Sequence, residues 1–173
     1  TTLVIPCNTA HAPPIFNEVK EQLSRNFPHI LLLHMIEETA KEIAHQFPNP
    51  TTIGLMATLG THALKTYPAA LEHYRHISLI EPDEEGKHRV HDAIYNSDYG
   101  IKAKKSVSET ALDILLREAH TLQSRGAKAI ILGCTELPLA LTNKTIDLPL
   151  IDPTEILARS AIWHTEGSKL KDR

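Results

Sequence analysis

Cysteine is scarce in this 173-residue chain, and its two thiols, Cys7 and Cys134, form no C-x-x-C motif. This spacing indicates neither a disulfide scaffold nor a zinc site, and free thiols fit a reducing cytoplasm. Long apolar runs are also lacking, because none approaches the roughly 20 residues that cross a bilayer. The glycines form no G-x-G-x-x-G run, so a nucleotide site has no support. We therefore expect a cytoplasmic protein without a membrane partner.

Charge of one sign is lacking too. The chain has 18 Lys and Arg against 21 Asp and Glu, a net charge of −3, and no basic stripe interleaved with aromatics. Nucleic acid is therefore not a predicted partner. Histidine is frequent, with His88 and His91 three residues apart and His73 and His76 on either side of an expected turn. No carboxylate or thiol stands at a supporting spacing, so we predict solvated surface histidines and no metal.

Apolar residues alternate between short strand-like runs and longer helical stripes along the chain. This alternation predicts an α/β fold with parallel sheets flanked by helices. The expected strands are residues 2–6, 30–33, 51–58, 76–81, 127–132 and 146–151, and the expected helices are residues 15–27, 36–47, 62–67, 83–96, 108–125, 137–141 and 154–164.

The turn at Pro48-Asn49-Pro50 marks the boundary that we expect between two lobes. Residues 1–48 would belong to a first lobe, residues 49–151 to a second, and residues 152–173 to a helix and tail that return to the first. The chain begins directly on a strand, although a parallel strand normally lies inside a covered sheet. We therefore expect the first lobe to be incomplete in this chain.

Both thiols directly follow a short apolar strand and precede a threonine, in Cys7-Asn8-Thr9 and in Cys134-Thr135. Open α/β sheets bind ligands at the carboxyl ends of their strands. Two thiols on opposite sides of one substrate carbon could remove a proton from one face and return one to the other. Such an inversion needs no metal or organic cofactor. The competing interpretation is that both cysteines are small buried hydrophobes.

Three segments carry a family resemblance: residues 6–11 (PCNTAH), 57–61 (ATLGT) and 132–138 (LGCTELP). They resemble the signature segments of the cofactor-independent aspartate/glutamate racemase family, and most of all its aspartate racemase branch. The resemblance implies two pseudo-symmetric α/β lobes, an active site in the cleft between them and a homodimer. It also implies a small dicarboxylic amino acid as substrate and no cofactor.

Carried over by position, Cys7 and Cys134 would be the two acid/base thiols of this family. In the aspartate racemase branch of this family, a lysine pairs with the substrate's side-chain carboxylate. Lys102 resembles that lysine by its position, and Lys104 and Lys105 are alternatives. Glu136 could hydrogen-bond either the thiol or the substrate ammonium. The implied substrate-binding residues are Asn8, Thr9, Thr58, Gly60, Thr61, Lys102, Thr135 and Glu136.

The departure from the family pattern lies at the start of the chain. A family member would begin with a glycine-rich strand–turn segment that contributes substrate contacts, so we expect weak or no catalysis by this chain alone. Two other functions stay open. One is a cysteine-dependent isomerase of unsaturated diacids from the same superfamily. The other is a catalytically inactive fragment that binds an amino acid.

Overall fold

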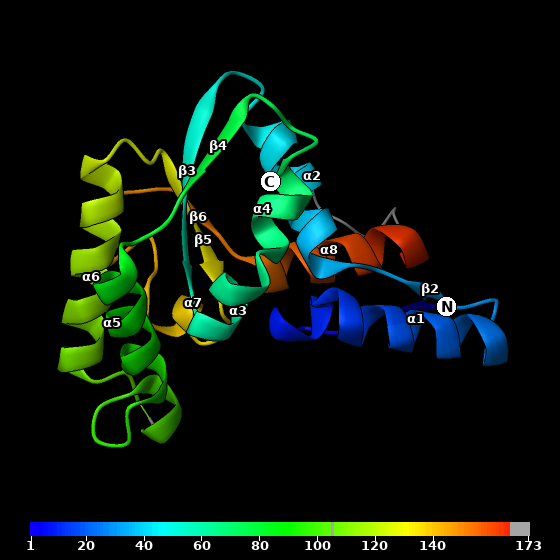
Figure 1. Ribbon diagram of the computed structural model, residues 1–173, viewed down its shortest axis with the longest axis horizontal. Helices are drawn as coiled ribbons and strands as arrows, with labels where there is room; N and C mark the ends of the chain where they lie inside the picture. Colours follow the sequence, from blue (N-terminus) through cyan, green and yellow to red (C-terminus); the bar gives the residue numbers. More distant parts are fainter. Residues whose placement is uncertain (105, 167–173) are drawn as a thin grey trace.

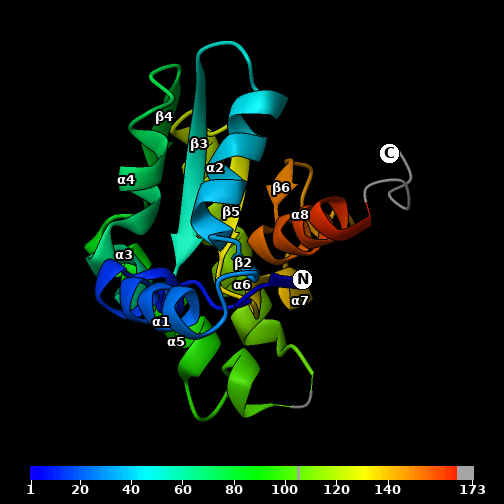
Figure 2. The same cartoon turned by 90° about the vertical axis from the view of Figure 1, so that its right-hand side faces the viewer.

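The computed structural model describes residues 1–104 and 106–166, and its centre is a parallel sheet of four strands in the order β4-β3-β5-β6. Figures 1 and 2 show this sheet from two directions at right angles. The expected α/β fold with parallel sheets flanked by helices is confirmed. The strands are β3 (Thr51–Ala57), β4 (Ile77–Ile80), β5 (Ala129–Gly133) and β6 (Leu150–Ile151).

The two central strands form because their sequences are apolar along their whole length. All five residues of β5 are buried, and so are the last five of β3. Such runs are typical of parallel strands covered on both faces. At Gly133 a Cβ would lie 2.9 Å from the Ala57 Cβ and 3.0 Å from the Met56 carbonyl oxygen, so glycine permits this close approach.

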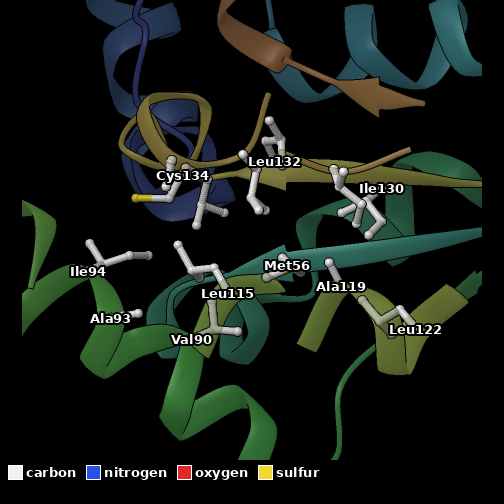
Figure 3. Packing of buried hydrophobic residues seen from close by; sticks show 14 of the residues in the cluster. Met56, Val90, Ala93, Ile94, Leu115, Ala119, Leu122, Ile130, Leu132 and Cys134 are labelled. Atoms are coloured by element: carbon white, nitrogen blue, oxygen red, sulfur yellow. The ribbon is translucent and has the colours of Figure 1, made fainter. Parts of the chain in front are cut away.

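One face of the sheet is covered by α5, α6 and α7. Their apolar stripes pack with Met56, Ile130 and Leu132 into a single buried cluster that also contains Cys134 (Figure 3). The Ser108 hydroxyl accepts a hydrogen bond of 3.1 Å from the Ala111 N–H and so caps the start of α6. The helices of this face are α5 (Glu84–Tyr95), α6 (Glu109–Ser124) and α7 (Leu137–Ala140).

The opposite face is covered by α2, α4 and α8 (Figure 1). Their buried side chains pack with Ile53, Leu55 and Ile131 of the central strands. No helix among the described residues is long and apolar enough to span a membrane. The helices on this side are α2 (Met35–Gln46), α4 (Thr66–Leu71) and α8 (Pro153–Glu166), with α3 (Leu59–Leu64) at the carboxyl end of β3.

A second, much smaller sheet joins two short parallel strands, with Thr2 opposite Leu31 and Leu3 opposite Leu32. One leucine of each strand, Leu3 and Leu31, is exposed. Helix α8 packs against both α2 and the first of these strands. The lobe boundary near residue 48 stays a prediction. The elements of this region are β1 (Thr2–Leu3), the 3₁₀ turn η1 (Thr9–His11), α1 (Pro13–Asn26) and β2 (Leu31–Leu32).

Several details of the predicted elements were wrong. The strands expected over 2–6, 30–33 and 146–151 are each two residues long. The single helix expected over 62–67 is two helices, α3 and α4, separated by Lys65 with a φ of 49°. The cause is Pro68, whose ring would clash with the Leu64 carbonyl in a continuous helix. Between α5 and α6, where neither a helix nor a strand was expected, lies a second 3₁₀ turn, η2 (Ile101–Ala103), which carries Lys102.

Candidate active site

The site is built where two neighbouring strands end. The register pairs Ala57 of β3 with Gly133 of β5, so the next residues, Thr58 and Cys134, follow at the same edge of the sheet. Cys134 is 9% exposed and continues the apolar row of Ile130 and Leu132 (Figure 3). The predicted position of this thiol, at the carboxyl end of a buried central strand, is therefore confirmed.

Three groups converge on the carboxylate of Glu136. The Cys134 thiol donates a hydrogen bond of 2.9 Å to Oε2, and the Thr135 hydroxyl donates one of 3.0 Å to the same oxygen. Lys102 Nζ lies 2.6 Å from the other oxygen, Oε1. The expected hydrogen bond between Glu136 and the thiol is present, and the carboxylate fixes the direction of the S–H bond.

This arrangement keeps Cys134 protonated. Burial raises the pKa of the Cys134 thiol to about 12, and the hydrogen bond to the Glu136 carboxylate adds to the shift because a nearby anion disfavours a thiolate. The positive charge of Lys102 opposes the shift without cancelling it. At neutral pH, the Cys134 thiol is therefore protonated.

The carboxylate and the ammonium hold each other charged. Desolvation acts to raise the pKa of Glu136, but the hydrogen bonds from Cys134, Lys102 and Thr135 outweigh it and lower that pKa. The same hydrogen bond from Lys102 to Glu136 raises the pKa of Lys102. The Lys102 ammonium also lies 5.2 Å from the centre of the Tyr95 ring, a cation–π contact. Sequence reasoning missed Tyr95, because nothing in the chain order links it to Lys102.

The other thiol, Cys7, is exposed and lies in the segment between β1 and η1. Its N–H donates to the Ile5 carbonyl at 2.9 Å, and its own carbonyl accepts from the Ala10 N–H at 3.2 Å. The next residue, Asn8, is buried, and its Oδ1 accepts a hydrogen bond of 2.6 Å from the Tyr67 hydroxyl of α4. Tyr67 therefore ties the Cys7 segment to the layer that covers the central sheet.

Tyr67 was also missed by sequence reasoning. Its only signal is general: a buried tyrosine needs a partner for its hydroxyl. Its complete burial raises its pKa well above the usual range, and the nearby negative charge of Asp152 raises it further. The phenol therefore stays protonated and donates its hydrogen bond to Asn8.

The threonines of the middle segment lie together at the start of α3. The Thr58 hydroxyl accepts from the Thr61 N–H at 3.3 Å and lies 3.2 Å from the Thr61 hydroxyl, so it caps the helix. Both threonines are buried, whereas Gly60 and Thr9 are exposed. Of the alternative lysines, Lys104 is exposed and residue 105 lies outside the described part of the chain.

Metal ligands do not gather in the part of the chain that the structure describes, where no group of three or more His, Cys, Asp or Glu side chains could hold an ion. The prediction of solvated histidines was wrong for His91, which is half-buried and accepts from the Leu59 N–H at 3.5 Å. Its ring also packs on Tyr95, with ring centres 4.8 Å apart. The start of α3 approaches α5 here, which is a tertiary contact that spacing in the sequence does not predict.

The chain is similar to known racemases over most of its length. It is 31% identical over 153 residues to an uncharacterized protein in the pnlA 3′ region of Pectobacterium carotovorum, covering 86% of this chain and 92% of that protein. It is 27% identical over 162 residues to the broad specificity amino-acid racemase RacX of Bacillus subtilis, covering 92% of this chain and 63% of that enzyme. It therefore spans just under two thirds of RacX.

Solved structures and family membership agree with these similarities. The aspartate racemase of Picrophilus torridus superimposes with a TM-score of 0.77 at 26% identity, covering 98% of this chain and 64% of that one. Residues 1–161 match the Asp/Glu/hydantoin racemase family. With this match and the shared α/β architecture, the chain belongs to the Asp/Glu/hydantoin racemase family.

Proposed function

We propose that this chain carries the proton-transfer machinery of a cofactor-independent amino-acid racemase that acts on aspartate, with glutamate as the second candidate substrate. The observation that carries this proposal is the Cys134 thiol, held at the end of β5 by a carboxylate that Lys102 neutralises. A second thiol, Cys7, lies in a segment that the bond between Asn8 and Tyr67 anchors to α4, one of the helices that cover the central sheet. A small dicarboxylic amino acid fits a site that combines thiols, hydroxyl groups and one lysine.

In the proposed mechanism, Cys7 acts first as the base and Cys134 as the acid. The Cys7 thiolate removes the Cα proton from one face of the substrate and becomes a thiol, leaving the electron pair on the carbon. The Cys134 thiol then donates its proton to the opposite face and becomes a thiolate. The product has inverted configuration, no net proton is consumed, and the reverse reaction starts from the Cys134 thiolate.

The difficult step is removal of the weakly acidic Cα proton, so the site must stabilise negative charge on the substrate α-carboxylate. Asn8, Thr9 and Thr135 are the proposed donors. The Asn8 side-chain oxygen already accepts from Tyr67, which leaves its amide N–H groups to donate to the substrate. Thr58 and Thr61 would line the same pocket, with Gly60 allowing close backbone approach.

The substrate's side-chain carboxylate is the proposed second partner of Lys102. Because Lys102 is bound to Glu136 in this structure, the substrate must compete with that carboxylate for the ammonium. Glu136 would then be free to bind the substrate ammonium group while it still accepts from the Cys134 thiol. For the whole protein we propose a homodimer in the cytoplasm.

Deuterium exchange tests the proposed reaction directly. The test uses a protein that also carries the family's glycine-rich N-terminal segment, because weak or no catalysis is expected of this chain alone. Incubated with L-aspartate in deuterated water, that protein should give D-aspartate with deuterium at Cα, followed by NMR and chiral chromatography. Cys7→Ala and Cys134→Ala should each abolish inversion, since either change removes one proton carrier. A matched control is Thr142→Ala, away from both thiols in the sequence, which should retain exchange. If inversion survives in either cysteine variant, that residue has no part in the mechanism.

The same samples separate the two other candidate functions. Conversion of a cis-unsaturated diacid such as maleate into its trans isomer, without exchange at Cα of aspartate, would favour the isomerase. A rise in melting temperature with aspartate, without turnover or exchange, would favour an amino-acid-binding module. Faster exchange with glutamate than with aspartate would change the assigned substrate and keep the racemase.

A further inference from the structure

One aromatic side chain without an assigned role lies beside the proposed site. Tyr95 is the last residue of α5, and the centre of its ring lies 5.2 Å from Lys102 Nζ. Tyr95 is 50% exposed, although an aromatic ring gains most from burial. The two residues before it, Ala93 and Ile94, are buried in the cluster that α5 forms with the central sheet (Figure 3). The helix therefore holds this exposed ring at a fixed place next to the ammonium.

The Tyr95 ring is supported by its own helix. His91 stands one turn earlier in α5, and the centres of the two rings are 4.8 Å apart with an angle of 31° between their planes. Side chains four residues apart lie on the same face of a helix. The Leu59 N–H donates to His91 Nδ1 at 3.5 Å, so the start of α3 is connected to the same pair of rings. Tyr95 thus belongs to a row of contacts that runs from the end of β3 to Lys102.

The backbone that carries Lys102 is held close to the end of α5. The Gly100 N–H donates to the Asn96 carbonyl at 2.9 Å, and a Cβ on Gly100 would lie 2.5 Å from that carbonyl oxygen, so this turn requires glycine. The next residue, Ile101, is buried and belongs to the same cluster. The backbone at Lys102 is therefore fixed, and the place of its ammonium depends on what the side chain contacts.

Lys102 Nζ has two partners of different kinds. Glu136 Oε1, at 2.6 Å, competes with any second carboxylate for the ammonium. The Tyr95 ring does not compete, because the attraction comes from the negative face of the ring and leaves the N–H groups free to donate. The ring can therefore keep the ammonium in place while one carboxylate replaces another. At an exposed site, such a contact changes an affinity by about two- to fivefold.

We propose that Tyr95 is a positioning residue, which holds the Lys102 ammonium beside Glu136 and Cys134 so that it can bind the substrate's side-chain carboxylate. This inference rests on the proposed function, in which Lys102 is the partner of that carboxylate. Tyr95 would act on substrate binding and not on proton transfer, because the side-chain carboxylate is bound in the same way in the ground state and in the transition state. The part of Tyr95 that contributes is the ring and not its hydroxyl group.

Steady-state kinetics with aspartate test the proposal, in the protein that also carries the family's glycine-rich N-terminal segment. Tyr95→Leu keeps an apolar side chain and removes the ring, so the KM for aspartate should rise about two- to fivefold while kcat is retained. Tyr95→Phe keeps the ring and should retain both values. Trp163→Leu removes an exposed aromatic ring from α8 and is the matched control, which should change neither value. An unchanged KM in Tyr95→Leu, or an equal rise in Tyr95→Phe, would overturn the proposal.

Alkylation of Cys134 by iodoacetamide tests the same contact in this chain without turnover, since Lys102 favours the Cys134 thiolate. Tyr95→Leu should slow this reaction about twofold, because the ammonium is held less firmly beside the thiol. The same change should have no further effect in a chain that already carries Lys102→Met. An unchanged rate in Tyr95→Leu, or an equal decrease in the presence of Lys102→Met, would refute a role through Lys102.

The two measurements also separate this inference from the proposed function. Absence of aspartate turnover in the parent protein would contradict the proposed function. The alkylation rates would still decide whether Tyr95 positions Lys102.

Discussion

The two thiols lie in regions of opposite character. Cys134 follows a strand with neighbours on both sides in a sheet covered on both faces, and its thiol donates to a fixed carboxylate. Cys7 is exposed and follows a two-residue strand whose one partner is equally short. Asn8 and the Tyr67 hydroxyl anchor the Cys7 segment in place of a large sheet. The fold thus supplies one buried thiol in a fixed position and one accessible thiol.

The difference has a physical cause. In a central parallel strand, backbone hydrogen bonds on both sides and buried side chains on both faces fix the position of the residue that follows. A two-stranded sheet has free edges and is marginally stable by itself. The position of Cys7 therefore depends on a few specific bonds, whereas that of Cys134 depends on the whole sheet.

The largest expected effect is in the chemical reactivity of the two thiols. A thiol with a pKa of about 12 instead of 9 holds about a thousandfold less thiolate at pH 8, and burial limits access further. Iodoacetamide should thus modify Cys7 far faster than Cys134, as measured by mass spectrometry of peptides. The Cys134 rate should rise about tenfold per pH unit up to the limit of folding. As a control, the two thiols should react at similar rates when the chain is unfolded in urea. Similar rates for Cys7 and Cys134 in the folded chain would contradict the proposed difference between the two thiols.

The next largest effect is a difference between the two sheets in how much a leucine side chain contributes to the free energy of unfolding. Leu115 is fully buried between α6 and the central sheet, so Leu115→Ala should lower the free energy of unfolding by about 2–5 kcal/mol. Leu3 on β1 is 39% exposed, and Leu3→Ala should cost less than about 1 kcal/mol. Urea unfolding monitored by circular dichroism gives both values. Equal losses would mean that the small sheet is as tightly packed as the large one.

A smaller effect isolates the carboxylate beside Cys134. Glu136→Gln keeps the side-chain shape and removes the negative charge that disfavours the thiolate, so the pKa of Cys134 should fall. We expect alkylation of Cys134 at pH 8 to become about tenfold faster, while Cys7 is unchanged. Glu72→Gln, at an exposed position in the turn after α4, is the matched control. No change in the Cys134 rate would remove Glu136 from the control of this thiol.

The smallest effect has the opposite sign. Lys102 favours the Cys134 thiolate, so Lys102→Met should raise the pKa of Cys134 and slow its alkylation. Because the Lys102 side chain is 40% exposed and screened by water, we expect only about a threefold change. The neighbouring Lys104→Met should have no effect. Two substitutions that shift the rate in opposite directions distinguish electrostatic control from a loosened fold, which would accelerate alkylation in both variants.

Much of the fold could be predicted because its signals are local. The buried runs of β3 and β5, the cap at Ser108 and the end of α6 before Gly126 depend on neighbours within a few residues. The prediction failed at Pro68, because the helix-breaking effect of this proline was overlooked. Predicted strands around β1 and β2 were too long, because strand length is set by the partner available for pairing and not by apolar residues alone.

The candidate site also combines features that depend on neighbouring residues with contacts between residues far apart in the chain. The sequence by itself determined that two thiols follow apolar strands and that Glu136 stands within reach of Cys134, since both relations are short in chain distance. Only the tertiary structure decided that Tyr67 bonds to Asn8 and that Lys102 reaches Glu136. Those contacts join separate elements, and they depend on how helices pack on a sheet, which no single stretch of sequence encodes.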